Sequence, residues 1–177
     1  MSKGFTLIEL LVTIAIIGIL SSALFLGRRV GEEKLALQRA AYKLAQDLRE
    51  VQGMTMGAGE VSCAATTAYS FGAHFELGSP TSYYLFADCD GDQSYNSGSD
   101  ELLREAVQLE KGIELTRLEV QGSSTSSLDI VFVPPDPINY INSEDWGAEG
   151  IITLCLESDS SQQRTVKMNT AGRIEVK

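Results

Sequence analysis

Histidine and the other usual components of catalytic sites are scarce in this chain of 177 residues. There is one histidine, His74, and the sequence contains no G-x-S-x-G motif, no phosphate-binding loop and no pair of metal-binding histidines. His74 lies in a strand-like run with Phe71, Phe75 and Leu77. A histidine of the core or of a sheet face fits that run as readily as a general base does. The sequence therefore predicts that the protein is not an enzyme.

Basic residues are also few, with 14 lysines and arginines against 24 aspartates and glutamates and a formal net charge of -10. General affinity for nucleic acid is therefore not expected, and the acidic balance favours a soluble, exported domain. A length of 177 residues with 44% hydrophobic content suits one globular head plus a helix, and not two independent domains.

Cysteine is limited to Cys63, Cys89 and Cys155, an odd number. An exported head with three cysteines has either one disulfide and a spare thiol or three buried thiols, and the sequence does not choose between them. Their wide spacing and the lone histidine give a zinc site little support. The cysteines are interpreted as small buried core residues and not as metal ligands, because free cysteine is among the most buried residue types.

The chain does have a long apolar run, over residues 5–26, in which Glu9 is the one ionisable residue. A helix of about 22 residues is roughly 33 Å long, enough to cross the hydrocarbon core of a bilayer. The run therefore predicts a membrane-inserting helix, preceded by Lys3. A carboxylate inside such a span costs a few kcal/mol, so Glu9 is expected to need a cation as its partner. A cleaved secretory signal fits poorly, because apolar residues 24–26 follow the small residues 21–23.

The segment Gly4-Phe5-Thr6-Leu7-Ile8-Glu9 resembles the prepilin-type cleavage and methylation motif of type IV pilins and type II secretion pseudopilins. The resemblance implies that a prepilin peptidase cuts after Gly4 and methylates the new N-terminus at Phe5, while the helix is kept. It also implies that Glu9 pairs with the N-terminal ammonium of a neighbouring subunit during assembly. Such a charge pair is strong at low dielectric, and either charge alone would be penalised there. The alternative is a plain signal anchor with a stray glutamate.

Residues 27–57 predict an amphipathic continuation of the helix. One face carries apolar residues at alternating spacings of four and three, namely Leu37, Ala41, Leu44, Leu48 and Val51. The opposite face carries the polar residues Arg39, Lys43, Gln46, Asp47, Arg49 and Glu50. The apolar stripe is too short to support a coiled coil, so it is expected to pack on a sheet.

Residues 58–177 predict a β-rich head made of short strands separated by turn residues, which indicates an antiparallel sheet and an α+β fold. The candidate strands are 68–77, 83–87, 102–108, 113–120, 128–133, 150–157, 164–169 and 173–176. The prolines at 134–137 are expected to open a loop that carries Trp146. Residues 158–162 and 170–172 are expected to be hairpin connections, and the serines at 123–127 a flexible linker.

The order of several loose motifs in the head is similar to that of minor pseudopilin H and the FimT-like proteins. The segments that carry this resemblance are 69–72 with Phe75, 131–135, 152–155, 164–166 and 171–174. The resemblance implies two β-sheets packed beside the long helix and a place at or near the tip of a short periplasmic pilus. A major pseudopilin is the second choice within the class.

An acidic stretch from Asp88 to Glu101 is the one candidate for binding an ion. Carboxylates at alternating positions around a glycine can converge on calcium, and the residues expected to bind it in a structural role are Asp88, Asp90, Asp92 and Asp100. The stretch departs from an EF-hand loop, because Gln93 and Ser99 stand where that loop has glycine and glutamate. A solvated acidic turn between strands is the alternative. No cofactor is expected to be required.

Positive charge gathers at the C-terminal end, at Arg164, Lys167, Arg173 and Lys177. These residues are candidates for contact with the phosphates of DNA, in which case affinity would fall steeply with salt. A charged sheet face is the favoured alternative.

The predicted organisation is therefore a leader at 1–4, a transmembrane and filament-core helix at 5–26, an amphipathic helix half at 27–57 and a head at 58–177. By resemblance, the chain is expected to be a minor pseudopilin of a type II secretion system. It would be anchored once in the bacterial inner membrane with its head exported, and would then enter a periplasmic pseudopilus. Its expected partners are the prepilin peptidase, other pseudopilins or pilins, and membrane lipid. The alternatives are a minor type IV pilin used in pilus assembly or DNA uptake, and a membrane-tethered calcium-binding adhesion module.

Overall fold

The structure of the protein is a computed structural model that describes residues 4–57, 59–64, 66–134 and 138–177. Of residues 23–30 and 138, the backbone alone is described. The chain divides into two compact units, Met1–Leu35 and Ala36–Lys177. The predicted leader lies mostly at residues 1–3, outside the described part. The fold is α+β and pilin-like, as the sequence predicted.

One helix, α1 (Leu7–Met56), contributes to both units. In the second unit the predicted stripe of α1 is confirmed, since Leu37, Ala41, Leu44, Leu48 and Val51 are all buried. Ala40 and Ala45 extend this face, and together these side chains form one core with those of the strands. The helix ends close to the predicted boundary, where glycines follow at positions 57 and 59.

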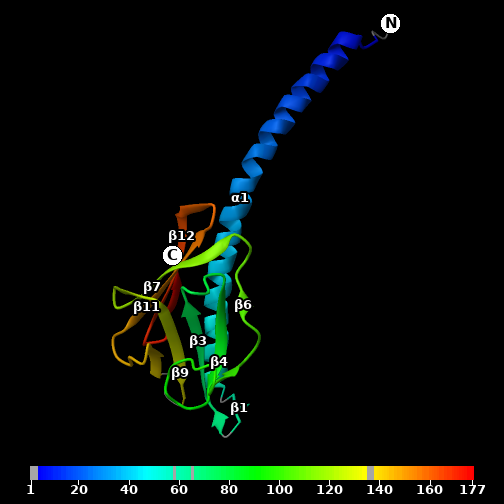
Figure 1. Cartoon of the computed structure of the whole chain (residues 1–177). Helices are drawn as coiled ribbons and strands as arrows, with labels where there is room; N and C mark the ends of the chain where they lie inside the picture. The colour runs from blue at the N-terminus through cyan, green and yellow to red at the C-terminus, as the bar shows by residue number, and fades with distance from the viewer. Residues whose placement is uncertain (1–3, 58, 65, 135–137) are drawn as a thin grey trace. The chain divides into compact units, whose positions relative to one another are not determined.

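The strands in the described part of the chain form three antiparallel sheets, and several of these strands are labelled in Figure 1. The small sheet pairs β1 (Val61–Ser62) with β2 (Thr67–Ala68). The first large sheet has the order β10-β9-β3-β4-β5, and β6 also pairs with β4. Its strands are β3 (Ser70–Glu76), β4 (Ser82–Asp88), β5 (Glu101–Leu102), β6 (Val107–Gln108), β9 (Ser127–Val133) and β10 (Ile138–Ile141). The second large sheet has the order β13-β12-β11-β7-β8. Its strands are β7 (Ile113–Val120), β8 (Ser123–Thr125), β11 (Glu149–Leu156), β12 (Asp159–Asn169) and β13 (Ile174–Val176).

Helix α1 is joined to both large sheets by polar contacts as well as by the apolar core. On the side of the first sheet, the Tyr83 hydroxyl donates to Asp47 Oδ2 at 2.5 Å. On the side of the second sheet, Arg49 Nη2 donates to the Ile174 carbonyl at 3.3 Å and Gln52 Nε2 donates to the Gly172 carbonyl at 3.3 Å. The second half of α1 is therefore a shared support for both sheets.

Four sequence predictions about local structure are wrong, and in each case pairing with another strand is the reason. The serine-rich stretch at 123–127 is not a flexible linker, because Ser123–Thr125 pair with β7 as strand β8. The loop expected after the prolines contains β10, which pairs with β9. The expected strand 102–108 is divided into β5 and β6, which pair with β4 at separate places. The connection expected at 158–162 is shorter, because β12 begins at Asp159.

The prediction for Asp47 is also wrong. This residue was expected on the polar face of the helix, but it is buried. Besides the Tyr83 hydroxyl, its carboxylate has Arg104 Nη2 at 3.1 Å and Lys43 Nζ at 3.6 Å. Arg104 lies between β5 and β6, so the interruption of that strand places a guanidinium on the helix. A buried carboxylate is tolerated when it is paired and hydrogen-bonded in this way. Burial and the hydrogen bond to Asp47 raise the pKa of Tyr83.

Replacing Tyr83 with phenylalanine should lower the free energy of unfolding by about 1 to 3 kcal/mol, because the buried Asp47 carboxylate loses a donor. The measurement is chemical denaturation of the full chain in non-ionic detergent. The control is Tyr84→Phe, since Tyr84 lies on the opposite face of β4 and keeps its ring stacking on Tyr95. Equal destabilisation by the two variants would show that the Asp47 contact is unimportant.

Candidate functional site

The beginning of α1 exposes apolar side chains on all sides. Every described side chain from Phe5 to Ser22 is exposed within the first unit. Phe5 is 80% exposed and Leu7 81% exposed, and the other large members are Ile8, Leu10, Leu11, Val12, Ile14, Ile16, Ile17, Ile19 and Leu20. A surface of this kind is far more apolar than a soluble monomer normally shows, so it marks a surface for a membrane or a protein partner.

Thr6 and Glu9 close the beginning of this helix as a capping box. Glu9 Oε2 accepts hydrogen bonds from the Thr6 backbone amide at 2.9 Å and from the Thr6 hydroxyl at 2.8 Å. The Glu9 backbone amide donates in turn to Thr6 Oγ1 at 3.4 Å. This reciprocal arrangement satisfies donors that the first turn of a helix leaves unpaired. Glu9 thus has hydrogen-bonding partners within its own chain, and its pairing with a cation stays a prediction.

This cap was missed because Glu9 was considered only as a charge in an apolar run. The spacing of Thr6 and Glu9 is itself a capping-box signature, since a threonine is followed three residues later by a glutamate before a hydrophobic run. The signal was therefore present in the sequence.

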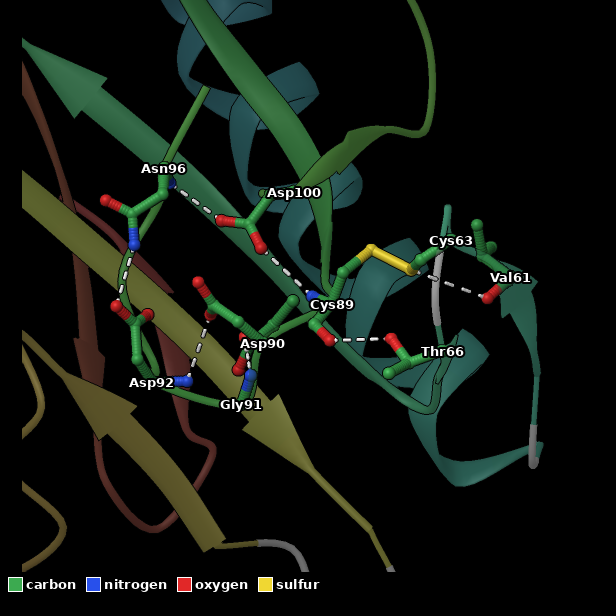
Figure 2. The surroundings of a disulfide bond; sticks show 10 residues. Val61, Cys63, Thr66, Cys89, Asp90, Gly91, Asp92, Asn96 and Asp100 are labelled. Carbon is green, nitrogen blue, oxygen red and sulfur yellow. Dashed lines mark hydrogen bonds between the residues drawn. A yellow bond between two sulfur atoms is a disulfide. The ribbon is translucent and has the colours of Figure 1, made fainter. Parts of the chain in front are cut away.

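Three of the four predicted metal ligands lie close together at the end of β4. Asp88, Asp90 and Asp100 each offer an oxygen, and these oxygens lie within 4.8 Å of one another. Asp92 is not in this group, and its two oxygens accept from Ser94 N at 2.9 Å and from Asn96 Nδ2 at 2.7 Å. Figure 2 shows Asp90, Asp92 and Asp100 in the loop that follows Cys89.

Backbone amides already serve the two buried carboxylates of the cluster. Asp88 accepts from Gly91 N at 2.7 Å and from Gln93 N at 3.3 Å. Asp100 accepts from Cys89 N at 2.9 Å and from Asn96 N at 2.7 Å. Each carboxylate oxygen has a second lone pair, so these bonds are compatible with a cation and also with the turn that the sequence offered as the alternative. Calcium binding by Asp88, Asp90, Asp92 and Asp100 stays a prediction.

The cysteines pair in one of the two ways that the sequence left open. Cys63 and Cys89 form a disulfide across a separation of 26 residues, and Cys155 is a buried free thiol. The disulfide ties the segment after α1 to the acidic loop, and Thr66 Oγ1 adds a hydrogen bond to the Cys89 carbonyl at 2.8 Å (Figure 2). Cys155 lies in β11, and burial raises the pKa of its thiol. It is therefore a core residue and not a reactive group.

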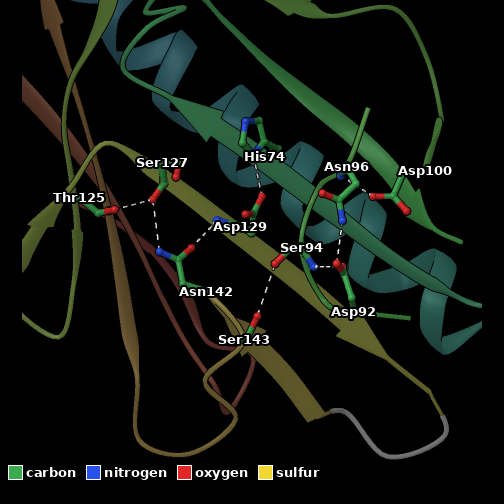
Figure 3. A network of polar contacts seen from close by, with 10 residues as sticks. All are labelled: His74, Asp92, Ser94, Asn96, Asp100, Thr125, Ser127, Asp129, Asn142 and Ser143. Atoms are coloured by element: carbon green, nitrogen blue, oxygen red, sulfur yellow. Dashed lines mark hydrogen bonds and ion pairs between the residues drawn. The ribbon is translucent and has the colours of Figure 1, made fainter. Parts of the chain in front are cut away.

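His74 of β3 contacts both the neighbouring strand β9 and the acidic loop, and Figure 3 shows its contact with Asp129 of β9. Its Nδ1 is 2.6 Å from Asp129 Oδ1 on β9, and its ring lies 4.9 Å from the Tyr95 ring of the loop. Tyr95 also packs on Tyr84 and on the buried Phe86. Phe86 in turn lies over Gly72, where a Cβ would come within 2.7 Å of the Phe86 ring. His74 is thus a sheet-face residue in contact with a carboxylate, one of the two roles that its sequence pattern allowed.

The four C-terminal basic residues do not gather on one face. Lys167 of β12 lies opposite Glu175 of β13 in the strand register, so both side chains are on the same face of the sheet. Arg173 and Lys177 are two residues from Glu175 on either side and lie on that face too. Arg164 is three residues from Lys167 and therefore lies on the opposite face of β12. Lys167 also lies 3.3 Å from Glu149, and Arg173 and Lys177 form ion pairs with Glu175. Contact of these residues with DNA stays a prediction.

Comparison with known proteins agrees with the N-terminal segment. A family model described as the prokaryotic N-terminal methylation motif matches residues 1–25. No match was found among curated proteins or solved structures. The motif indicates the type IV pilin-like superfamily and a pilin or pseudopilin subunit, and proteins of this kind are typically structural and not enzymatic.

The same motif implies processing by a prepilin peptidase and anchoring in the inner membrane before assembly into an extracytoplasmic filament. Among the residues that the structure describes, no helix combines the length and the apolar character needed to cross a membrane. The predicted span 5–26 includes residues 23–26, whose side chains lie outside the described part.

The crowding of the acidic cluster predicts a pH dependence of stability without divalent cations. Burial, with smaller contributions from Asp100 and Asp90, raises the pKa of Asp88 from 3.8 to about 6. The folded state then binds more protons than the unfolded state between these values. The contribution of Asp88 to the free energy of unfolding should therefore rise as pH falls from above 6 towards 4, and Asp88→Asn should remove it. Denaturation at several pH values in chelator is the measurement, and an unchanged slope in this variant would contradict the assignment.

Calcium at neutral pH should raise the melting temperature if the carboxylates bind it, because a ligand of the folded state stabilises that state. The geometry makes Asp100→Asn the variant expected to abolish the effect. Asp92→Asn is the matched control and should retain most of it, because Asp92 lies outside the close group. A wild-type melting temperature that is equal in calcium and in chelator would contradict calcium binding.

Proposed function

We propose that the chain is a minor pseudopilin, a structural subunit of a type II secretion pseudopilus. It would be cut after Gly4 and methylated at Phe5, and it would assemble through the first half of α1. The observation that supports this best is Glu9 in a run of exposed apolar side chains within the segment 1–25 that the methylation motif matches. The two antiparallel sheets beside α1 agree with the layout implied by resemblance to pseudopilin H and the FimT-like proteins.

The assembly role assigned to Glu9 follows from the cost of an unpaired charge. In a filament core of packed helices, the Glu9 carboxylate and the Phe5 ammonium of a neighbour would each be penalised alone and stabilised together. The capping box complements this role, because the Thr6 contacts hold one carboxylate oxygen at the helix start. Apolar contact along residues 7–26 would supply most of the association.

Replacing Glu9 with glutamine should separate the charge from the cap. Glutamine can serve at the same position of a capping box, but it cannot pair with an ammonium. We expect at least about a tenfold loss of incorporation, because removing one partner of a buried ion pair costs about 3 to 5 kcal/mol. The measurement is the amount of the chain in sheared filament fractions, with mass spectrometry confirming a mature chain that begins at methylated Phe5.

Thr6→Ala is the matched control, because it removes the capping hydroxyl and keeps the carboxylate. It should cost about 1 kcal/mol of helix stability and affect incorporation less. Wild-type incorporation of Glu9→Gln would contradict the pairing mechanism. An intact Met1 in the purified chain would contradict processing altogether.

Deleting the chain should stop export of folded proteins across the outer membrane, since a missing subunit of the pseudopilus prevents its formation. Surface pili and DNA uptake should be unaffected in the same cells. The measurement compares secreted proteins, surface pili and transformation between deletion and complemented strains. Normal secretion with loss of pili or of DNA uptake would replace this proposal with a minor type IV pilin.

A further inference from the structure

Trp146 is the most exposed of the large hydrophobic side chains, at 89%. The buried aromatic side chains of the head contrast with it, since Phe71, Phe75, Tyr83, Phe86 and Phe132 are each at most 2% exposed. Trp146 is also the only tryptophan of the chain. A fully presented indole offers a large rigid face with a polar N–H, which is the kind of side chain that dominates binding surfaces.

The loop that carries Trp146 is held in place by its neighbours. At its start, Ile141 and Glu144 exchange backbone hydrogen bonds at 3.0 and 3.1 Å. At its end, Ala148 is buried and its carbonyl accepts from Thr170 N at 3.1 Å. Gly147 between them has a φ of +69°, a conformation that few other residues adopt. Both ends of the loop are thus anchored, and the indole faces solvent between them.

A hollow of about 750 Å³ lies beside the indole. It is formed by the Trp146 loop and by the turn between β12 and β13, and its lining is Asp145, Trp146, Gly147, Ala148, Glu149, Asn169, Thr170 and Ala171. Its size lies within the range of pockets that hold small ligands or side chains. The turn is itself fastened, because Gly172 N donates to the Asn169 carbonyl at 2.9 Å and Asn139 Nδ2 donates to the Thr170 carbonyl at 2.9 Å.

The charge of the hollow selects among the ligands that an indole can bind. The lining holds two carboxylates, Asp145 and Glu149, and none of its eight residues is basic. Exposed Glu144 precedes them, and the whole chain carries a net charge of -10. Lys167 lies 3.3 Å from Glu149 and offsets part of this charge. An aromatic face beside carboxylates complements a cation, which the ring attracts through its quadrupole and the carboxylates attract directly.

We propose that this hollow, formed by the Trp146 loop and the β12–β13 turn, is a docking site for a lysine or arginine side chain on a basic segment of another protein. The cation lies over the indole of Trp146 and contacts the carboxylate of Asp145. The site lies on the head, beside the second large sheet, and all of its lining residues belong to the second unit. It does not depend on which filament system uses the chain.

Trp146 also supplies a direct measurement of binding, because its fluorescence has no contribution from another tryptophan. The full chain in non-ionic detergent is titrated with an acetylated and amidated pentalysine peptide. Saturable change in Trp146 emission is expected, weakening as salt rises because exposed charges are screened. A pentaglutamate peptide and a neutral N-acetylglucosamine tetramer are titrated in parallel and should produce no saturable change.

Two pairs of variants separate the site from general attraction to an acidic protein. Asp145→Asn should weaken pentalysine binding about twofold or more, while Glu105→Gln, which removes one exposed carboxylate elsewhere, should not. Trp146→Ala, followed by calorimetry, should weaken it at least about threefold, while Tyr69→Ala, at another exposed aromatic, should not. Both tested side chains are exposed, so the variants are expected to fold.

Three results would overturn the proposal. The first is the absence of saturable binding to pentalysine. The second is equal weakening by Asp145→Asn and Glu105→Gln, or unchanged binding in Trp146→Ala, either of which would show attraction to net charge alone. The third is saturable binding of the neutral oligosaccharide without binding of pentalysine, which would assign the indole to a glycan.

Discussion

The outward-facing apolar surface at the beginning of α1 is the constraint on which the rest of this molecule depends. Within the described part of the first unit, these side chains are exposed to solvent instead of being buried by their own chain. An apolar surface of this size is unfavourable in water, so the chain requires lipid or other subunits around it. The head must then fold and remain soluble independently of whichever surrounding the helix has.

The second unit meets this requirement by burying one stripe of the same helix in the core that it shares with the strands. The apolar stripe of α1 from Leu37 to Val51 is in the core, and Asp47 connects the helix to Tyr83 of β4 and to Arg104. The same helix therefore changes from a surface that needs an external partner to one that its own chain covers. This division explains why one element can serve both attachment and folding.

The acidic loop and the Trp146 loop are two further features of the head. They differ in whether their most distinctive side chains contact other parts of the same chain. In the acidic loop, backbone amides serve the carboxylates of Asp88 and Asp100, the Cys63–Cys89 disulfide anchors one end, and Tyr95 packs on His74. The side chains of that loop therefore mainly hold the loop itself in place. The Trp146 loop is also anchored at both ends, yet its largest side chain is exposed to solvent. An exposed indole on an anchored loop favours a role in binding a partner.

Local pattern in the sequence was enough to predict the elements whose apolar residues recur at a regular spacing. The stripe from Leu37 to Val51 predicted the buried helix face, and the range 113–120 coincides with β7. The cleavage motif, which includes Glu9, could likewise be recognised from adjacent residues alone. Tertiary structure alone decided that Cys63 pairs with Cys89, that Asp47 is buried against Tyr83 and Arg104, and that Asp100 lies close to Asp88 and Asp90. The physical reason is that each of these outcomes depends on a partner distant in sequence, whose position no local periodicity specifies.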